Sequence, residues 1–419
     1  MENVFSTIIG YEDIKLELMR IMDQLRNPEK YAALGVTNTH GLLLHGEPGV
    51  GKSTFARCFV DHCGRKTFIC RKDKPNGDFV KEISRIFDEA EANAPSLVFL
   101  DDMDKFANPD ERCRDAEEFV TVQACIDRVK DKDVFVVATA NNIQKLPHSL
   151  VRAGRFDHVL ELDNPEGEDA HAIIAHYLSK KSYVADLDTK QIARLLEGHS
   201  CAQLENVINQ AAIYAVFDGR SQIEMADMMK AILRLIFNAP EKRNFNKDSL
   251  PRIACHEAGH VLVAELLEPN SVDMVTILAH DSSAAGITSL HRDENYFRSK
   301  RLMEIRIMCL LAGKAATEIC YGEVDTGANS DLRRAFNIAH RFVDHYCSYG
   351  FDQFVIEENA SNEVLNRRDA RIAAEIDRYY NRTRQFLMDH RPQLDALIDA
   401  LLEEKTLLSG RVQELLKVA

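Results

Sequence analysis

The feature that most constrains the fold of this chain is the glycine-rich segment GEPGVGKS, residues 46–53. It follows the short apolar run GLLLHG (41–46) and precedes the helix-period segment STFARCFVDHC (53–63). A GxxxxGK[ST] pattern between a strand and a helix is typical of a phosphate-binding loop, because its glycines let backbone N–H groups surround a phosphate at the start of the helix. We therefore predict a parallel α/β sheet that binds a nucleotide.

This spacing assigns a contact to each part of the loop. Lys52 is expected to reach the β- and γ-phosphates, and the Ser53 hydroxyl is expected to hold Mg²⁺. The cofactor is therefore predicted to be ATP with Mg²⁺. The loop residues predicted to contact it are Gly46, Glu47, Pro48, Gly49, Val50, Gly51, Lys52, Ser53 and Thr54.

The apolar run SLVFLDD (96–102) supplies an acidic pair to the same site. A carboxylate at the end of a buried strand beside the loop can orient Mg²⁺ and its water shell. Asp101 is predicted in that role, and Asp102 is predicted to polarise the attacking water. Without the loop, such a pair would more commonly cap a helix or a turn.

The chain of 419 residues is too long for one ordinary domain. Strand-like runs alternate with helical stretches up to residue 164, which predicts a parallel sheet covered on both faces, a three-layer αβα domain. Helix-period segments then predict an all-helical subdomain over 165–240, and the aperiodic, proline-containing stretch 238–251 reads as a linker. The third predicted domain, 241–419, is mainly helical with a strand-like insert near 274–290.

The segment HEAGH (256–260) predicts a metal site in the third domain. On a helix it places His256 and His260 on one face, where both can bind one Zn²⁺, with Glu257 beside the metal as general base. The pattern also arises by chance on ordinary helices. Val263 and Leu266 exclude the elongated HExxHxxGxxH form, so the third ligand comes from further along the chain. The downstream candidates are Glu318, Asp325 and Asp331.

Composition limits the kinds of partner and the cellular location that the chain can have. The net charge of −14 opposes binding to nucleic acid, and no run approaches the roughly 18 apolar residues of a membrane helix. No secretion signal is visible, and the ten cysteines form no CxxC pair, so we expect reduced thiols and a cytoplasmic protein. Membrane association is expected only if an N-terminal anchor has been removed.

The order of these motifs resembles the AAA+ ATPases. Asn141 matches the polar sensor of the γ-phosphate, and IIGYED (8–13), with Ile9 and Gly10, matches the segment beside the adenine. SLVRAGRFD (149–157) resembles the segment whose two arginines, here Arg152 and Arg155, reach the nucleotide of a neighbouring subunit. Arginines supplied in trans require an oligomer, so the resemblance implies a homo-oligomeric ring, usually a hexamer.

The second half resembles the FtsH family of AAA+ zinc proteases. The stretch DTGANSDLRRA (325–335) is similar to the segment that carries the third zinc ligand, and the matching position is Asp331. VTILAHDSSAAGITSLH (275–291) resembles a strand pair beside the zinc, with 286–290 as the expected edge strand for a substrate backbone. The resemblance implies an AAA+ domain with an all-α lid, then a mainly α zinc metalloprotease domain. The implied function is ATP-dependent degradation of unfolded proteins.

Three departures keep alternatives open. The acidic pair is Asp-Asp where the family has Asp-Glu, and 70–80 lacks the aromatic-hydrophobic-glycine run of a pore loop, for which Phe79 or Lys74 could substitute. The family's membrane helices are absent at the front, so the chain is either a natural soluble form or a piece of a longer protein. The rival functions are a non-proteolytic remodelling ATPase and a zinc peptidase with a slow regulatory ATPase half.

Overall fold

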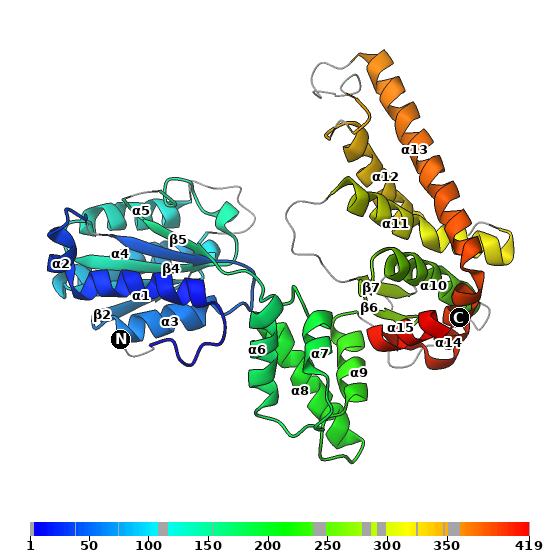
Figure 1. The fold of residues 1–419 in the computed structure, drawn as a ribbon. Coiled ribbons are helices and arrows are strands. Elements are labelled where there is room, and N and C mark those ends of the chain that lie inside the picture. Colours follow the sequence, from blue (N-terminus) through cyan, green and yellow to red (C-terminus); the bar gives the residue numbers. More distant parts are fainter. Residues whose placement is uncertain are drawn as a thin grey trace. The chain divides into compact units, whose positions relative to one another are not determined.

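The computed structural model divides into two compact units, Met1–Glu224 and Met225–Ala419, which we treat separately. Figure 1 traces the elements along the chain. The residues it describes are 4–37, 39–73, 75–107, 116–152, 154–237, 249–278, 286–290, 299–323, 326–346, 348–350 and 361–418.

The first unit is built on a five-stranded sheet in the order β2-β3-β4-β1-β5, and all its neighbouring strands pair in parallel. The predicted parallel sheet is therefore confirmed. Two of its strands, β2 and β5, lie at the edges, and three apolar strands lie at the centre. The strands are β1 (Gly41–His45), β2 (Lys66–Arg71), β3 (Ser96–Asp101), β4 (Val134–Ala140) and β5 (His158–Glu161).

Helices cover both faces of this sheet because the central strands are apolar on both sides. Successive residues alternate between two cores: Leu43 packs with the helices of one face, and Leu42 and Leu44 pack with those of the other. The first face carries α4 (Asn76–Ala92) and α5 (Glu117–Val129). The second carries α1 (Glu12–Arg26) and α3 (Lys52–His62), which completes the predicted αβα layers.

Three helices follow the sheet within the first unit: α6 (Gly167–Leu178), α7 (Thr189–Leu195) and α8 (Cys201–Phe217). A capping box between Ser200 and Gln203 starts α8. The predicted helical subdomain is therefore present. Its boundaries at 164/165 and 240/241 stay predictions, since 238–248 lie outside the described residues and the compact units divide at Glu224.

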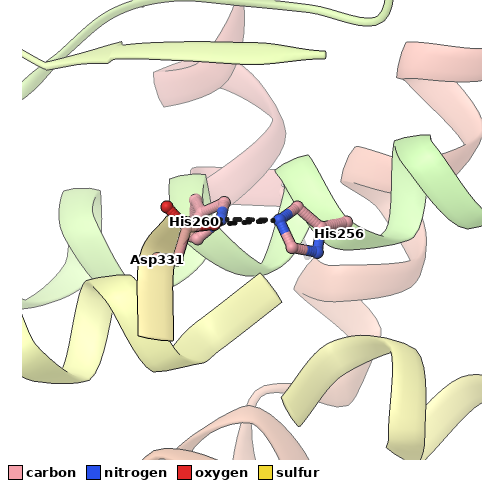
Figure 2. Close-up of side chains that lie close together, drawn as sticks. All are labelled: His256, His260 and Asp331. Atoms are coloured by element: carbon pink, nitrogen blue, oxygen red, sulfur yellow. Dashed lines mark hydrogen bonds and ion pairs between the residues drawn. The ribbon is translucent and has the colours of Figure 1, made fainter. Parts of the chain in front are cut away.

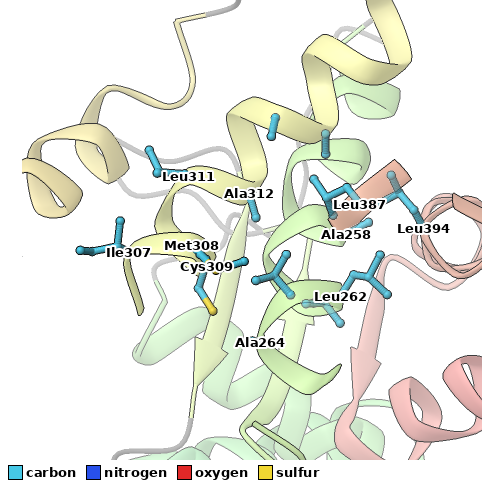
Figure 3. Packing of buried hydrophobic residues seen from close by; sticks show 14 of the residues in the cluster. Ala258, Leu262, Ala264, Ile307, Met308, Cys309, Leu311, Ala312, Leu387 and Leu394 are labelled. Atoms are coloured by element: carbon cyan, nitrogen blue, oxygen red, sulfur yellow. The ribbon is translucent and has the colours of Figure 1, made fainter. Parts of the chain in front are cut away.

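The second unit is mainly helical, as predicted, and packs around α10 (Leu250–Leu267), which carries HEAGH. α10 lies against α11 and α14, and Ala258, Leu262, Ala312 and Leu394 belong to its core (Figure 3). The other helices are α9 (Met225–Leu235), α11 (Lys300–Tyr321), α12 (Asn329–Val343), α13 (Asn362–Asp389), α14 (Arg391–Glu404) and α15 (Ser409–Val418).

A three-stranded antiparallel sheet completes this unit, in the order β7-β6-β8. The insert predicted near 274–290 forms β6 (Val272–Thr276) and β7 (Ile287–Leu290). Its third strand, β8 (Thr406–Leu408), lies in a region that we predicted as helical. Three residues are too few to carry a period of two against the long helices on either side.

The structure also bears on the residues suggested to contact a substrate and on membrane-spanning helices. Phe79 is fully buried in α4 and packs edge-on against Phe106, with ring centroids 4.8 Å apart, so the suggestion that it grips a substrate is wrong. Lys74, the other suggestion, lies outside the described residues. Across the described ranges, no helix combines the length and the apolar character needed to cross a bilayer.

Candidate nucleotide and zinc sites

The phosphate-binding loop lies where the carboxyl ends of three strands meet. β1 runs directly into it, and the neighbouring strands β4 and β3 end beside it, so their following residues share one edge of the sheet. Gly46, Gly49 and Gly51 have φ values of 146°, 89° and 106°. A Cβ on Gly46 would lie 2.0 Å from the Leu162 carbonyl oxygen, so this turn requires glycine.

The Lys52 ammonium group lies folded over this loop. Its Nζ donates hydrogen bonds to the carbonyl oxygens of Gly46, at 2.9 Å, and Glu47, at 2.7 Å. Burial lowers the pKa of Lys52, and the nearby carboxylates of Asp102 and Asp104 oppose that shift. A phosphate chain on the loop would therefore meet a largely desolvated cation.

Asp101 ends β3 as a buried carboxylate. Its Oδ1 accepts hydrogen bonds from the hydroxyls of Thr139, at 2.9 Å, and Ser53, at 3.3 Å. The predicted Mg²⁺ residues Ser53 and Asp101 are thus in contact. Thr139, on β4, was missed because a threonine inside an apolar strand carries no signal of its own.

Asp102 and Asn141 also lie together, as their predicted roles require. The Asn141 side-chain amide donates to Asp102 Oδ1 at 3.4 Å, and Lys105 Nζ donates to Asp102 Oδ2 at 2.7 Å. Sequence reasoning missed Asp104, a buried carboxylate whose Oδ1 accepts the backbone N–H of Asn141 at 2.9 Å. Asp104 therefore fixes the turn that presents the Asn141 side chain.

The two arginines predicted to act in trans differ in their surroundings. Arg155 is buried and donates from Nε and Nη2 to the two carboxylate oxygens of Asp127, at 3.0 and 2.7 Å. These hydrogen bonds lower the pKa of Asp127. Arg152 is exposed. Only Arg152 therefore presents its guanidinium group outward in a single chain.

The segment matched to the adenine site contacts the helical subdomain. The Tyr11 backbone N–H, directly after Ile9 and Gly10, donates to Asp169 Oδ2 at 3.0 Å. Gly10 has φ 72°, and a Cβ there would lie 2.9 Å from the Asp169 carboxyl group. This segment therefore joins the sheet domain to α6.

The first turn of α8 contacts the phosphate loop itself. The Ala202 backbone N–H donates to the Gly49 carbonyl at 3.1 Å, and the Cys201 thiol donates to the Val50 carbonyl at 3.6 Å. No motif in the sequence predicted these contacts, since their partners lie far apart along the chain. These two contacts connect the start of α8 directly to the phosphate loop.

A cluster of metal-ligand atoms lies in the second unit. The Nε2 atoms of His256 and His260 are 3.0 Å apart, and Asp331 Oδ2 lies 3.3 Å from the first and 3.4 Å from the second (Figure 2). A tetrahedral zinc ion with ligands at about 2.0–2.1 Å separates its donor atoms by about 3.3–3.4 Å. The three side chains therefore fit one Zn²⁺ ion.

Of the other two candidates for the third ligand, Glu318 does not belong to this cluster. Glu318 hydrogen-bonds with Lys314 and Tyr380 instead. Asp325 lies outside the described residues. Asp331, in the first turn of α12, is the carboxylate that meets both histidines.

Neighbouring groups orient these donors. His260 Nδ1 lies 2.6 Å from the Cys309 carbonyl oxygen, which directs Nε2 toward the cluster. Burial alone would lower the pKa of His260, but the hydrogen bond with Asp331 and the charge of Glu257 leave that pKa raised. Burial alone would raise the pKa of Asp331, but the hydrogen bonds from the two histidines outweigh it and hold that pKa well below its ordinary value.

Glu257 lies beside the cluster and is buried. Its Oε2 accepts a hydrogen bond from the Thr288 hydroxyl at 2.7 Å. A Cβ on Gly286, the residue directly before β7, would lie 2.7 Å from Glu257 Cγ and Oε1, so only a residue without a side chain fits there. Sequence reasoning singled out 286–290 as an edge strand but missed the contact of Thr288 with the predicted base.

Comparison with known families matches both halves of the chain. A model described as "Peptidase family M41" matches residues 243–415. One described as "ATPase family associated with various cellular activities (AAA)" matches 42–164, and an AAA+ lid domain model matches 186–230. The order of the matched models is the order of the two sites described above.

Curated relatives match nearly the full chain. The ATP-dependent zinc metalloprotease FtsH 2 of Symbiobacterium thermophilum is 30% identical over 440 residues, which cover 98% of this chain and 74% of the relative. The chain belongs to the FtsH family of ATP-dependent zinc metalloproteases. The FtsH proteins of Bacillus subtilis and Thermomicrobium roseum are each 29% identical, over 98% of this chain and 69% and 68% of their own lengths.

Membership of the FtsH family confirms the zinc and ATP cofactors that the sequence predicted, together with the AAA+ and protease architecture. The individual roles of the site residues remain predictions, which rest on the geometry given above.

Proposed function

We propose that this FtsH-family protein is a zinc endopeptidase in which ATP hydrolysis drives polypeptides toward the HEAGH centre. The observation that carries the proposal is the convergence of His256, His260 and Asp331 beside a buried carboxylate. Two imidazoles and one carboxylate are a catalytic zinc set, because they leave a coordination position for water or substrate. Bound there, zinc would polarise the scissile carbonyl and acidify a water molecule.

Glu257 is the proposed general base. Glu257 follows His256 in sequence, and its negative charge raises the pKa of His260, so its carboxylate lies close to the cluster where a general base is needed. Thr288 holds one carboxylate oxygen, so the other can accept the proton of the attacking water and later pass it to the leaving amine. Thr288 is therefore a positioning residue for the base.

The β7 strand supports an extended polypeptide as the substrate. It lies at one edge of the β7-β6-β8 sheet and contacts Glu257 through Thr288. A substrate backbone paired with this edge would be an additional strand beside the proposed base. The acidic charge of the chain favours polypeptide over nucleic acid as the partner.

The first unit is the proposed ATPase. Lys52 and the loop amides would bind the phosphates, Ser53 and Asp101 would hold Mg²⁺, and Asp102 with Asn141 would orient the attacking water. The exposed Arg152 would stabilise transferring phosphate in a neighbouring copy, which requires a homo-oligomer. The AAA+ resemblance implies that this ring is a hexamer.

Degradation of an unfolded protein tests the proposal directly. The reaction would be run with ATP, with a non-hydrolysable ATP analogue and with a Glu257→Gln variant. We expect ATP-stimulated cleavage that Glu257→Gln abolishes while zinc content is unchanged. Cleavage that survives Glu257→Gln would rule out the zinc mechanism.

Two observations favour the rival in which the ATPase half is a slow regulatory switch. Asp102 is one methylene shorter than the family's glutamate and pairs with Lys105, and Phe79 is buried instead of lining a pore. A tightly folded substrate separates the two functions. A motor degrades it only when ATP is hydrolysed, whereas a switch leaves it intact under all conditions.

A further inference from the structure

A second group of metal-ligand side chains lies at the C-terminal end of α12, whose first turn carries Asp331. His340 Nε2 lies 3.7 Å from Asp344 Oδ2, and His345 Nδ1 lies 4.0 Å from the same oxygen. All three donor atoms lie within 4.8 Å of one another. Neither the proposed zinc protease nor the ATPase uses these residues.

Burial divides this group into a fixed carboxylate and two accessible rings. The Asp344 side chain is 5% exposed, whereas those of His340 and His345 are 38% and 58% exposed. The rings can therefore turn toward an ion arriving from solvent, and the carboxylate is already held in place. Imidazole with carboxylate is a donor set that suits zinc and other first-row divalent cations.

The donor atoms of His340 and His345 lie farther from their carboxylate than those of His256 and His260 lie from Asp331. Tetrahedral zinc requires about 3.3–3.4 Å between donor atoms, so the contacts of 3.7 and 4.0 Å with Asp344 would have to shorten by about 0.3 to 0.7 Å. Small rotations of the two exposed rings would bring about this change. The site also lies at a helix C-terminus, where the backbone dipole favours a cation.

The neighbouring Arg368 competes for the carboxylate of Asp344. Arg368 Nη1 lies 3.6 Å from Asp344 Oδ2, and Arg368 Nε also donates to Asp369 Oδ1 at 3.0 Å. Because Arg368 has this second partner, an ion at Asp344 would not leave the guanidinium group without a carboxylate. Its repulsion would nevertheless weaken binding relative to the HEAGH centre.

We propose that His340, Asp344 and His345 form a second binding site for a divalent transition-metal ion such as Zn²⁺. Three protein donors leave the remaining coordination positions to water. A bound ion would tie the last turn of α12 to the residues that follow it. This site is separate from the HEAGH centre and does not depend on the proposed protease mechanism.

Equilibrium dialysis of the full chain against Zn²⁺, followed by metal analysis, tests this proposal. The wild-type protein should bind two ions per chain, and a His340→Ala/His345→Ala variant should bind one. His62→Ala, which removes an exposed histidine in the first unit, is the matched control and should still bind two. Circular dichroism of each variant checks that the fold is intact.

Two further variants locate the second ion. Asp331→Asn weakens the HEAGH centre and should leave the ion at His340 and His345 bound. Arg368→Gln removes the competing cation and should lower the Kd of the second ion severalfold. A single ion per wild-type chain, or a second ion that persists in the double histidine variant, would overturn the proposal.

Discussion

At the scale of single residues, the contact between Thr288 and Glu257 allows the proposed role of the base to be tested. Thr288→Val keeps the shape of the side chain but removes the 2.7 Å hydrogen bond to the proposed base. A hydrogen bond to a charged group contributes about 1.5–3 kcal/mol, so kcat should fall by about 10- to 100-fold with little change in KM. The measurement is steady-state cleavage of a short fluorogenic peptide.

Thr288→Ser is the matched control, because it retains the hydroxyl and should retain most of the activity. Zinc content should be equal in all three proteins. If serine is as slow as valine, the hydroxyl is not sufficient for activity, and the hydrogen bond to Glu257 does not explain the loss.

Zinc binding should depend on pH through His260. Its raised pKa lies above the ordinary 6.5, and an imidazole must be deprotonated to bind zinc, so binding near neutral pH should release a proton. Zinc affinity should therefore fall by up to about tenfold per pH unit as pH drops through that pKa. Calorimetric titration in two buffers of different ionisation enthalpy measures the released proton.

The shifted pKa values of His260 and Asp331 also contribute to the stability of the metal-free protein. The raised pKa of His260 contributes stability that is fully present below pH 6.5 and is lost as pH rises through the folded-state pKa. The lowered pKa of Asp331 contributes stability that is present above 3.8 and is lost as pH falls further. The stabilisation that these two groups contribute should therefore be largest between about pH 4 and 6.5, and the melting temperature that metal-free Asp331→Asn loses relative to the wild type should be largest in that window. A loss that is largest outside it would contradict this assignment.

At the scale of elements, the approach of α10 to α11 depends on glycine. A Cβ on Gly313 would lie 2.4–2.6 Å from three atoms of the His256 ring. Gly313→Ala should therefore displace the ring, weaken zinc binding and destabilise the second unit by about 1–3 kcal/mol. Zinc affinity and thermal unfolding measure the two effects.

Gly410 in α15 offers the comparison, since a Cβ there meets nothing within 4 Å. Gly410→Ala should leave zinc binding unchanged and should not lower the melting temperature. Because alanine favours a helix more than glycine does, similar losses in both variants would mean that contact with His256 is not their cause.

Substitution of Arg155 should lower stability, whereas substitution of Arg152 should lower ATPase activity. Arg155→Ala removes a two-point contact with Asp127 and should cost about 1–3 kcal/mol of stability, since Asp127 is half exposed and screened by solvent. Arg152→Ala should leave the melting temperature unchanged but lower the ATPase rate of the assembled protein by about 10³-fold. A loss of ATPase activity in a monomeric form as well would exclude action in trans.

Among the elements, the sequence predicted those with a long, regular pattern. The strands around 41–46 and 96–102 and the helix carrying HEAGH formed as predicted. β8 was missed because its three residues carry no usable period. Phe79 was wrongly predicted to contact the substrate. The sequence does not distinguish an exposed aromatic side chain from one that packs in a hydrophobic core, as that of Phe79 does.

At the scale of the whole molecule, the two units should be separable by mutation. Lys52→Ala should abolish ATP binding and the degradation of a folded protein, and leave cleavage of a short unstructured peptide intact. Glu257→Gln should retain ATPase activity but lose both cleavage reactions. ATPase and peptidase assays of the same preparations test the coupling, and loss of peptide cleavage in Lys52→Ala would indicate that nucleotide is needed to assemble the protease itself.

By itself, the sequence determined the class of each site. The spacing in GEPGVGKS and HEAGH fixes local geometry, because residues of one turn or one helix face lie together wherever the helix is. The resemblance to the FtsH family added Asp331, which spacing alone left among three candidates.

Only the tertiary structure decided which distant side chains meet. It brought Thr139 and Asp104 to the predicted nucleotide residues, Thr288 to Glu257, and Asp127 to Arg155. It also joined the start of α8 to the phosphate loop. Such contacts depend on how strands align and helices cross, and the residues adjacent in sequence do not determine either.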